Sequence, residues 1–336
     1  MEARSCHLEF HLNDWNPVVL ARAVLFLTLA RNLDVLLVED MDFFWSLWCH
    51  LALTPRQLSR LQETSAALAA TDFDHGSNDI VISKEEDVAT LKSIWKSWAL
   101  CKDIPSVVRV VAMRKEKMMK HFNTSPTEAD PESVFHASCY TSARSMCEGF
   151  FMDRKEMEDM QPVVEKEALN WNQTGMTGLM ATPRTESGLL ANPTLLDPVS
   201  WQWHVHYAVN PFDGFMPLPP GCLQQPVGKK AGKGREEYPL TAACKTILRD
   251  QLIAFKAYSG GGDLRFHVWG SDALQLALYD LPSRMVSPKE DAAANEACLD
   301  ASARIPNCFD IIDTSNLADH VGLLNLLACC TPLLKS

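Results

Sequence analysis

The chain has no apolar run long enough to cross a bilayer. The longest run, residues 18–30, is interrupted by Arg22 and falls short of the roughly 20 residues that a membrane-spanning helix needs. The first seven residues, MEARSCH, also lack the basic and then apolar pattern of a secretory signal. We therefore expect a protein that does not contact a membrane.

Cysteine pairs with metal-binding or redox spacing are absent as well. The chain contains 11 cysteines, but none form a Cys-x-x-Cys motif, and the adjacent Cys329 and Cys330 lie in an apolar stretch. An odd number of scattered thiols is typical of a reducing compartment. We therefore expect a cytoplasmic protein.

An excess of basic residues is the third absence. The 31 Lys and Arg residues are outnumbered by 42 Asp and Glu, which gives a net charge of −11. A nucleic-acid-binding surface needs a concentrated basic patch, and acidic residues are interleaved among the basic residues between Lys84 and Lys120. Nucleic acid is therefore not an expected partner.

Periodicity divides the chain into strands and helices. Alternating apolar residues predict strands at residues 8–12, 201–207 and 264–269, and a short apolar run predicts another at 309–313. Helical spacing predicts a buried helix at 18–30, started by Asn16-Pro17, and a helical pattern over about 34–170, in which Thr54-Pro55 opens one helix. Further helices are predicted at 240–257 and 272–279. No internal repeat is present.

This order of elements predicts an α/β fold with a parallel sheet, because helices separate the strands. We expect residues 1–33 to form the first strand and helix of the α/β core. Residues 34–199 are expected to be a large, mainly helical insertion, and residues 200–336 complete the core. The proline-rich and Lys/Gly-rich stretch at about 211–239 predicts a mobile loop.

Asp14 is a candidate cofactor-binding residue. It directly follows the first predicted strand, and an acid at the end of a strand often binds a ribose in nucleotide-binding sheets. No glycine-rich loop precedes it, and Gly260 to Gly262 precede a strand instead of joining a strand to a helix. The phosphate side of such a site is therefore missing.

Histidines also alternate on two predicted strands. His7, Glu9 and His11 share one strand face, and His204 and His206 share another. Metal ligands can be spaced in this way, but a half-exposed strand face shows the same alternation without a metal. Because neither set has clear third and fourth ligands, we expect no metal site. No Gly-x-Ser-x-Gly motif is present either.

The polar loop after residues 309–313 is a candidate ligand or partner site, because ligands bind at the carboxyl ends of strands in open α/β sheets. Its short polar side chains are also typical of a helix cap, so a purely structural turn is the alternative. The candidate residues are Asp313, Thr314, Ser315, Asn316, Asp319 and His320.

Three tracts resemble the domain-of-unknown-function family 4470, which occurs in axonemal dynein assembly factor 3 and in MYND-zinc-finger proteins of fungi and animals. The tracts are residues 8–22, residues 171–175 together with 187–193, and residues 309–327. The resemblance implies a degenerate Rossmann or methyltransferase-like sheet. Family members usually have a strand and a glycine-containing loop before the segment that starts this chain, so we expect a shortened form or an incomplete gene model. No MYND cysteine-histidine array is present.

These observations favour a non-catalytic, cytoplasmic interaction or assembly factor that binds protein partners and needs no cofactor. The resemblance implies a relation to dynein-arm preassembly. The alternative is a methyltransferase that uses S-adenosylmethionine, with Asp14 on the ribose and the loop from Asp313 to His320 near the transferred methyl group.

Overall fold

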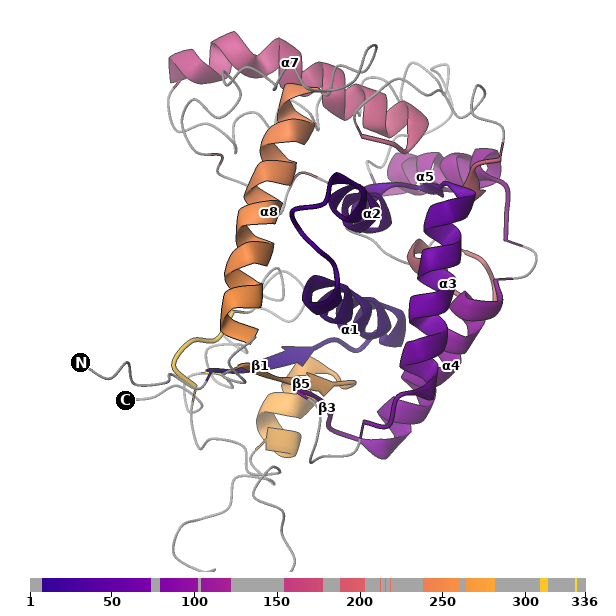
Figure 1. The fold of residues 1–336 in the computed structure, drawn as a ribbon, viewed down its shortest axis with the longest axis vertical. Helices are drawn as coiled ribbons and strands as arrows, with labels where there is room; N and C mark the ends of the chain where they lie inside the picture. Colours follow the sequence, from indigo (N-terminus) through magenta and orange to yellow (C-terminus); the bar gives the residue numbers. More distant parts are fainter. Residues whose placement is uncertain are drawn as a thin grey trace, which may run out of the picture. The chain divides into compact units, whose positions relative to one another are not determined.

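The structure of the chain is a computed structural model (Figure 1). It covers residues 8–73, 79–101, 104–121, 154–177, 188–202, 212, 215, 218, 238–259, 264–281, 309–313 and 330. The chain divides into two compact units: unit 1 contains residues 1–21, 71–92 and 261–336, and unit 2 contains residues 22–70 and 93–260. No helix in the described ranges is long and apolar enough to span a membrane.

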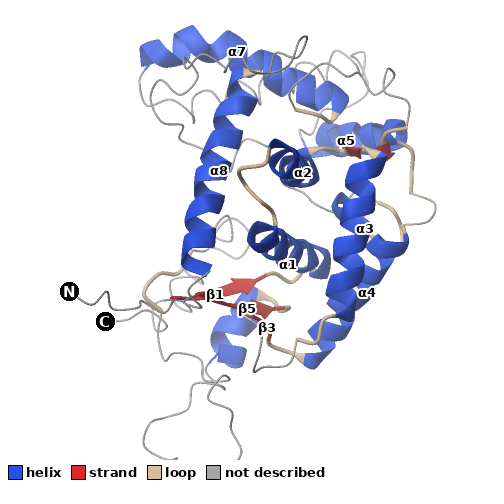
Figure 2. Ribbon diagram, in the orientation of Figure 1, coloured by secondary structure: helices blue, strands red, loops and turns tan. Residues whose placement is uncertain are grey.

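Unit 1 contains a small parallel sheet. Its strands are β1 (Leu8–Asn13), β5 (Leu264–Trp269) and β3 (Ile80–Ile82), and β5 lies between the other two. Figure 2 shows these strands side by side. Both pairings are parallel, and β1 aligns with β5 along its whole length. The predicted parallel pairing of residues 8–12 with 264–269 is therefore confirmed.

A short helical segment follows β5 and packs against Trp269, the last residue of that strand. It consists of α9 (Ala273–Gln275) and a π-helical turn, η4 (Leu276–Asp280). The Asp272 carboxylate accepts hydrogen bonds from the amides of Leu274 and Gln275, at 2.9 and 3.2 Å, which satisfies two free donors of the first turn. Leu276 packs with Trp269 in a buried cluster. The prediction that residues 272–279 are helical is therefore confirmed, with an α-helical start and a π-helical continuation.

The strand predicted at residues 309–313 is wrong. Only Phe309 forms a β-bridge, and residues 310–313 are irregular. Phe309 and Ile312 pack against the Trp269 cluster, whereas Ile311 is 83% exposed. This burial pattern lacks the alternation of a half-buried strand. The third strand of the sheet is instead β3, whose residues are all buried and which lies in the segment predicted to be helical.

The remaining elements are mainly helices, which make up most of the regular structure. The division between the units falls within α1 and α4, and the other helices below belong to unit 2. The helices are α1 (Pro17–Asn32), α2 (Val38–Cys49), α3 (Pro55–Ala70), α4 (Glu85–Leu100), α5 (Val107–His121), α7 (Arg154–Thr174) and α8 (Pro239–Ser259). Two short strands, β2 (Ala52–Leu53) and β4 (Leu190–Ala191), pair antiparallel in unit 2, and the 3-10 turn η1 (Pro193–Leu195) follows β4.

Local capping chemistry explains where two of the helices begin. Asn16 Oδ1 accepts a hydrogen bond from the Val18 amide at 2.9 Å, at the start of α1. At the start of α3, the Thr54 amide donates to Gln57 Oε1 and the Gln57 amide donates to Thr54 Oγ1, at 2.9 and 3.3 Å. This reciprocal pair is a capping box. Both helix starts agree with the starts predicted from Asn16-Pro17 and Thr54-Pro55.

Helix α8 is capped by a residue from another helix. The carboxylate of Glu167, on α7, accepts hydrogen bonds from the amides of Leu240 and Thr241 at 2.6 and 2.8 Å. Glu167 is only 2% exposed. A buried carboxylate is stabilised at this position because a helix N-terminus carries partial positive charge. The N-terminal end of α8 consequently lies against α7 (Figure 1).

The fold is therefore α/β as predicted, mostly helical and with a small parallel sheet. The predicted strand at 201–207 and the predicted loop at 211–239 lie almost wholly outside the described residues.

Candidate functional site

Asp14 lies at the carboxyl end of β1, where it forms the turn into α1. Its Oδ1 accepts a hydrogen bond from the Asn16 amide at 2.8 Å, and its own amide donates to the Trp269 carbonyl at 3.3 Å. Asn13, just before it, donates from Nδ2 to the carbonyls of Trp269 and Ser271, at 3.2 and 2.9 Å. The residue predicted to bind a ribose thus has a structural role in joining the ends of β1 and β5.

The carboxyl end of β5 is also occupied by the protein's own side chains. The Gly270 amide donates to Asp87 Oδ2 at 3.0 Å, and a Cβ atom at Gly270 would lie 2.5 Å from Asp87 Oδ1. Asp87 belongs to the first turn of α4. The Ser83 amide, just after β3, donates to the Val268 carbonyl at 3.0 Å. Hydrogen bonds within the chain therefore link the carboxyl ends of all three strands.

The predicted loop site can be placed at only one of its residues. Asp313 is exposed and is the last residue of the irregular segment 310–313. Thr314, Ser315, Asn316, Asp319 and His320 lie outside the described residues. Both the capping role and the partner-binding role of this loop stay predictions.

A buried polar cluster surrounds the C-terminus of α2, and we call it the α2 C-terminal cluster: Arg22, Asn192 and Thr194 with the carbonyls of residues 47–50. Arg22 is 4% exposed, and its guanidinium donates to the carbonyls of Leu47 and Trp48, at 3.1 and 2.5 Å, and to Thr194 Oγ1. These are carbonyls of the last helical turn, which lack partners within the helix and carry partial negative charge. Arg22, which the sequence showed only as a break in an apolar run, is therefore a helix-capping cation.

Asn192 completes this cluster from the other side. It is fully buried, and its Nδ2 donates to the carbonyls of Leu47 and His50, both at 3.0 Å. Its Oδ1 accepts from the amide and hydroxyl of Thr194, at 3.1 and 2.8 Å. Every donor and acceptor of the side chain is therefore engaged, as a buried amide requires.

The tract at residues 171–175 reaches the same place. Trp171 Nε1 donates to the Cys49 carbonyl at 2.9 Å, and the Leu51 amide donates to the Gly175 carbonyl at 2.8 Å. Gly175 has a φ of +72°, and a Cβ atom there would lie 2.5 Å from Leu51 Cδ1. The residue must therefore be glycine for both backbone and steric reasons. Arg22, Trp171, Gly175 and Asn192, which come from the tracts that carry the family resemblance, thus all bond to residues 47–51.

A buried histidine beside this cluster has the residue types of a catalytic dyad but the environment of a core group. Trp45 Nε1 donates to Thr177 Oγ1 at 2.5 Å, and the same hydroxyl forms a hydrogen bond with His50 Nε2 at 2.8 Å. Burial, and then the charge of Lys245, lower the pKa of His50 to about 3, so the ring is neutral. Burial raises the pKa of the neighbouring Cys49 thiol well above its usual range. The Cys49 thiol is therefore protonated near pH 7, as buried structural thiols are.

Two imidazoles stack on the sheet of unit 1. His11 and His267 are register partners on β1 and β5, and their ring centroids lie 4.5 Å apart with planes 9° from parallel. Trp269 Nε1 donates to His11 Nδ1 at 3.2 Å, and the Phe309 ring meets His11 edge-on at 5.0 Å. Burial first, and then His267, lower the pKa of His11 to about 3. The carboxylate of Glu9, two residues before His11, lies near both imidazoles.

Among the residues that the structure describes, three consecutive exposed apolar side chains lie in the turn between α1 and α2, which we call the 36–38 turn. Leu36, Leu37 and Val38 are 75%, 55% and 68% exposed. Isolated exposed apolar residues are ordinary on protein surfaces, but contiguous ones often mark an interaction site. The turn lies within unit 2. The exposed side chains of Leu36, Leu37 and Val38 are mostly in solvent, so packing within the chain does not account for their apolar character.

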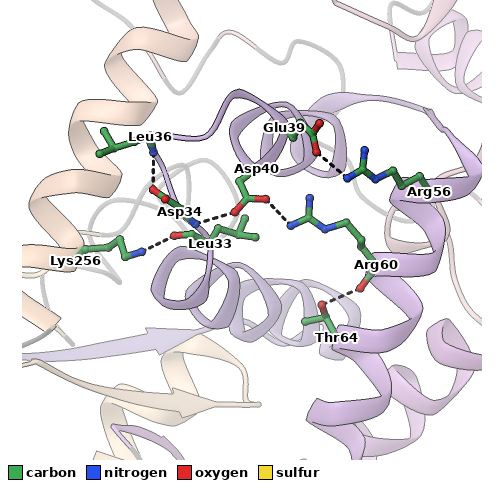
Figure 3. A network of polar contacts seen from close by, with 9 residues as sticks. All are labelled: Leu33, Asp34, Leu36, Glu39, Asp40, Arg56, Arg60, Thr64 and Lys256. Carbon is green, nitrogen blue, oxygen red and sulfur yellow. Dashed lines mark hydrogen bonds and ion pairs between the residues drawn. The ribbon is translucent and has the colours of Figure 1, made fainter.

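A polar network holds the 36–38 turn in place (Figure 3). Asp34 Oδ1 accepts from the Leu36 amide at 3.0 Å, and the Asp34 amide donates to Asp40 Oδ2 at 2.8 Å. Asp40 in turn pairs with Arg60 of α3 at 2.7 Å. Lys256 of α8 donates to the Leu33 carbonyl. The apolar side chains are therefore presented from a backbone that is fixed to two other helices.

The sequence comparison gives a match at the start of the chain. Residues 2–53 match the family described as Domain of unknown function (DUF4470). No curated protein and no solved structure matches the chain. The DUF4470 segment, residues 2–53, includes β1, α1, the 36–38 turn and the end of α2, but not the tracts at 171–193 and 309–327. Asp14, Arg22, Glu9 and His11 lie within it, whereas His267 and Asn192 lie outside it.

Proposed function

We propose that the chain is a non-catalytic interaction or assembly factor that binds protein partners in the cytoplasm. The 36–38 turn carries this proposal, because three consecutive apolar side chains are held in solvent by a defined network. A pre-ordered apolar anchor costs little conformational entropy when a partner covers it. Cys49 and Cys244 are buried and form no disulfide, which is compatible with a reducing compartment.

The α2 C-terminal cluster supports the same proposal. Much of the polar chemistry in the family-like tracts satisfies the carbonyls at the end of α2, and Asp14 joins two strands. These residues stabilise the fold. We propose assembly of large complexes, with a relation to dynein-arm preassembly, as the specific form of this role, and the support for it is the family resemblance.

The experiment compares partner capture by the parent protein and two variants. The triple variant Leu36→Ser, Leu37→Ser, Val38→Ser removes the apolar side chains, and Val199→Ser, at a residue 89% exposed elsewhere in unit 2, is the matched control. We expect captured cytoplasmic proteins, quantified by mass spectrometry, to fall about tenfold or more with the triple variant and to stay unchanged with the control. Each exposed substitution should change stability by less than about 0.5 kcal/mol. Equal capture by all three proteins would refute the interaction role of the turn.

The rival function is an S-adenosylmethionine-dependent methyltransferase. The parallel pairing of β1 and β5, with Asp14 directly after β1, favours it, because cofactors of this kind bind at the carboxyl ends of parallel strands. The hydrogen bonds that already link those ends favour the non-catalytic proposal. Calorimetric titration with S-adenosylmethionine and with its demethylated product separates the two. We expect no binding, and micromolar binding, roughly −8 kcal/mol, would replace our proposal with the enzymatic one.

A further inference from the structure

Three potential metal ligands meet on one face of the sheet in unit 1. Side chains alternate along a strand, so Glu9 and His11 leave β1 on the same side. His267 is the register partner of His11 on the adjacent strand β5, and it therefore lies beside His11 on that side. One donor atom from each of the three residues lies within 4.8 Å of the other two.

We propose that Glu9, His11 and His267 bind one divalent transition-metal ion, Zn²⁺ in the first instance. Two imidazoles and one carboxylate are ligands that Zn²⁺ and related ions prefer in proteins. Bonds of about 2.0–2.1 Å to a tetrahedral ion place its donors about 3.4 Å apart. The three donors therefore need to approach one another by up to about 1.4 Å. The stacked rings of His11 and His267 must also rotate out of parallel, so that both nitrogen lone pairs point at the ion.

The environment of His11 shows why an ion would be retained. Its Nε2 is buried and has no hydrogen-bond partner among the described residues, and an unsatisfied buried polar atom is costly. Because Nδ1 accepts a hydrogen bond from the Trp269 indole, which can only donate, the ring is neutral, and the neutral imidazole is the form that binds metals.

The hydrogen bond from Trp269 predicts what metal binding changes. An indole N–H can only donate, so His11 Nδ1 accepts it and the proton of the neutral ring lies on Nε2. An ion at Nε2 requires that proton to move to Nδ1, which then no longer accepts from the indole. An ion at Nδ1 displaces the indole directly. In both cases the hydrogen bond between Trp269 and His11 breaks.

The site also has an entry path and a counter-charge. Glu9 is exposed, His11 is half-buried and His267 is 5% exposed, so the donors run from the surface to the interior. The Glu9 carboxylate offsets part of the charge of a divalent ion at the outer end. Three protein ligands leave a fourth position for water. The ion would cross-link β1 to β5.

The test is calorimetric titration of the full chain with ZnCl₂, accompanied by tryptophan fluorescence. The variants are Glu9→Gln and His11→Gln, and the control is Glu86→Gln, which neutralises another exposed glutamate. Trp269→Phe is a fourth variant, because it removes the one of nine tryptophans whose hydrogen bond is expected to break. Glu9 is exposed, so Glu9→Gln tests the site even if the buried His11→Gln variant does not fold.

We expect one Zn²⁺ per chain, with an affinity about tenfold or more lower in Glu9→Gln and unchanged in Glu86→Gln. A fluorescence change should accompany binding in the parent protein and disappear in Trp269→Phe. The proposal is overturned if the parent binds no Zn²⁺. It is also overturned if Glu9→Gln binds Zn²⁺ as tightly as Glu86→Gln, because the ion would then be adventitious and bound elsewhere.

Discussion

His50 is a buried imidazole whose protonation is coupled to folding. Burial, and then Lys245, hold the pKa of His50 at about 3 in the folded protein, against an ordinary value of 6.5. Its Nε2 meets the Thr177 hydroxyl at 2.8 Å. The folded state therefore keeps a neutral ring over a pH range in which the unfolded chain takes up a proton.

The sign of the pH effect follows from this difference. Above about pH 6.5 neither state binds the proton, and below that value the unfolded state gains stability by about 1.4 kcal/mol per pH unit. We predict that His50→Gln removes this contribution, because a neutral amide can still meet the Thr177 hydroxyl. Urea unfolding of both proteins between about pH 6.5 and about pH 4 should show a steeper loss of stability in the parent protein. Parallel curves would contradict the prediction.

At the scale of the element, the end of α2 depends on side chains from distant segments. Arg22 approaches from α1 and Asn192 from the start of η1, and together they satisfy the carbonyls of Leu47, Trp48 and His50. A helix end buried without such partners would leave carbonyls unsatisfied. The cap is therefore a tertiary feature, built from residues far apart in the sequence.

We predict that Asn192→Ala destabilises the protein by about 3 kcal/mol, because the substitution leaves the His50 carbonyl and the Thr194 amide without this buried partner. Asn170→Ala is the control, since the Asn170 side chain donates to the Met176 carbonyl at 3.1 Å and is only half-buried. It should cost about 1 kcal/mol. Chemical denaturation of the three proteins measures both values, and equal losses would show that the α2 C-terminal cluster contributes little.

Local signals in the sequence predicted helix starts well. Asn16-Pro17 and Thr54-Pro55 form caps from residues within four positions of each other, so the sequence contains the whole interaction. β3 was missed because three residues are too few to show alternation within a helix-rich segment. Residues 309–313 were misassigned because their apolar positions resemble a strand, although Ile311 faces solvent.

The candidate sites were predictable only where their residues are close in sequence. His7, Glu9 and His11 were recognised as one strand face, but the third donor beside them, His267, lies on β5 and is brought there by sheet register. Spacing cannot reveal a partner of that kind. Similarly, the capping role of Arg22 depends on residues 47, 48 and 194. The sequence placed Asp14 correctly at the end of β1. It could not show that the Asp14 amide donates to the Trp269 carbonyl, because Trp269 is distant in the sequence.

At the scale of the whole molecule, the DUF4470 segment is not self-contained. Its strand β1 pairs with β5, and its strand β2 pairs with β4, so both pairings need residues beyond position 53. Arg22 lies within the segment but contacts Thr194, and the Cys49 carbonyl accepts from Trp171. The segment that matches the family is therefore shorter than the part of the chain that has to fold together with it.

We predict that a fragment of residues 1–53 does not fold. Alone, it would expose the apolar face of α2 and leave the α2 carbonyls with only part of their cap, and chains of about this length are marginally stable even with a complete core. Circular dichroism should show no cooperative thermal transition, and the amide proton spectrum should lack dispersion, whereas the full chain should show both. A longer fragment, residues 1–202, restores β4, Trp171 and Asn192 but not β5, so it should regain helical signal and a partial transition. A cooperative transition in the 1–53 fragment would mean that the contacts with residues 171–194 and with β5 are dispensable, and that the segment is a domain in its own right.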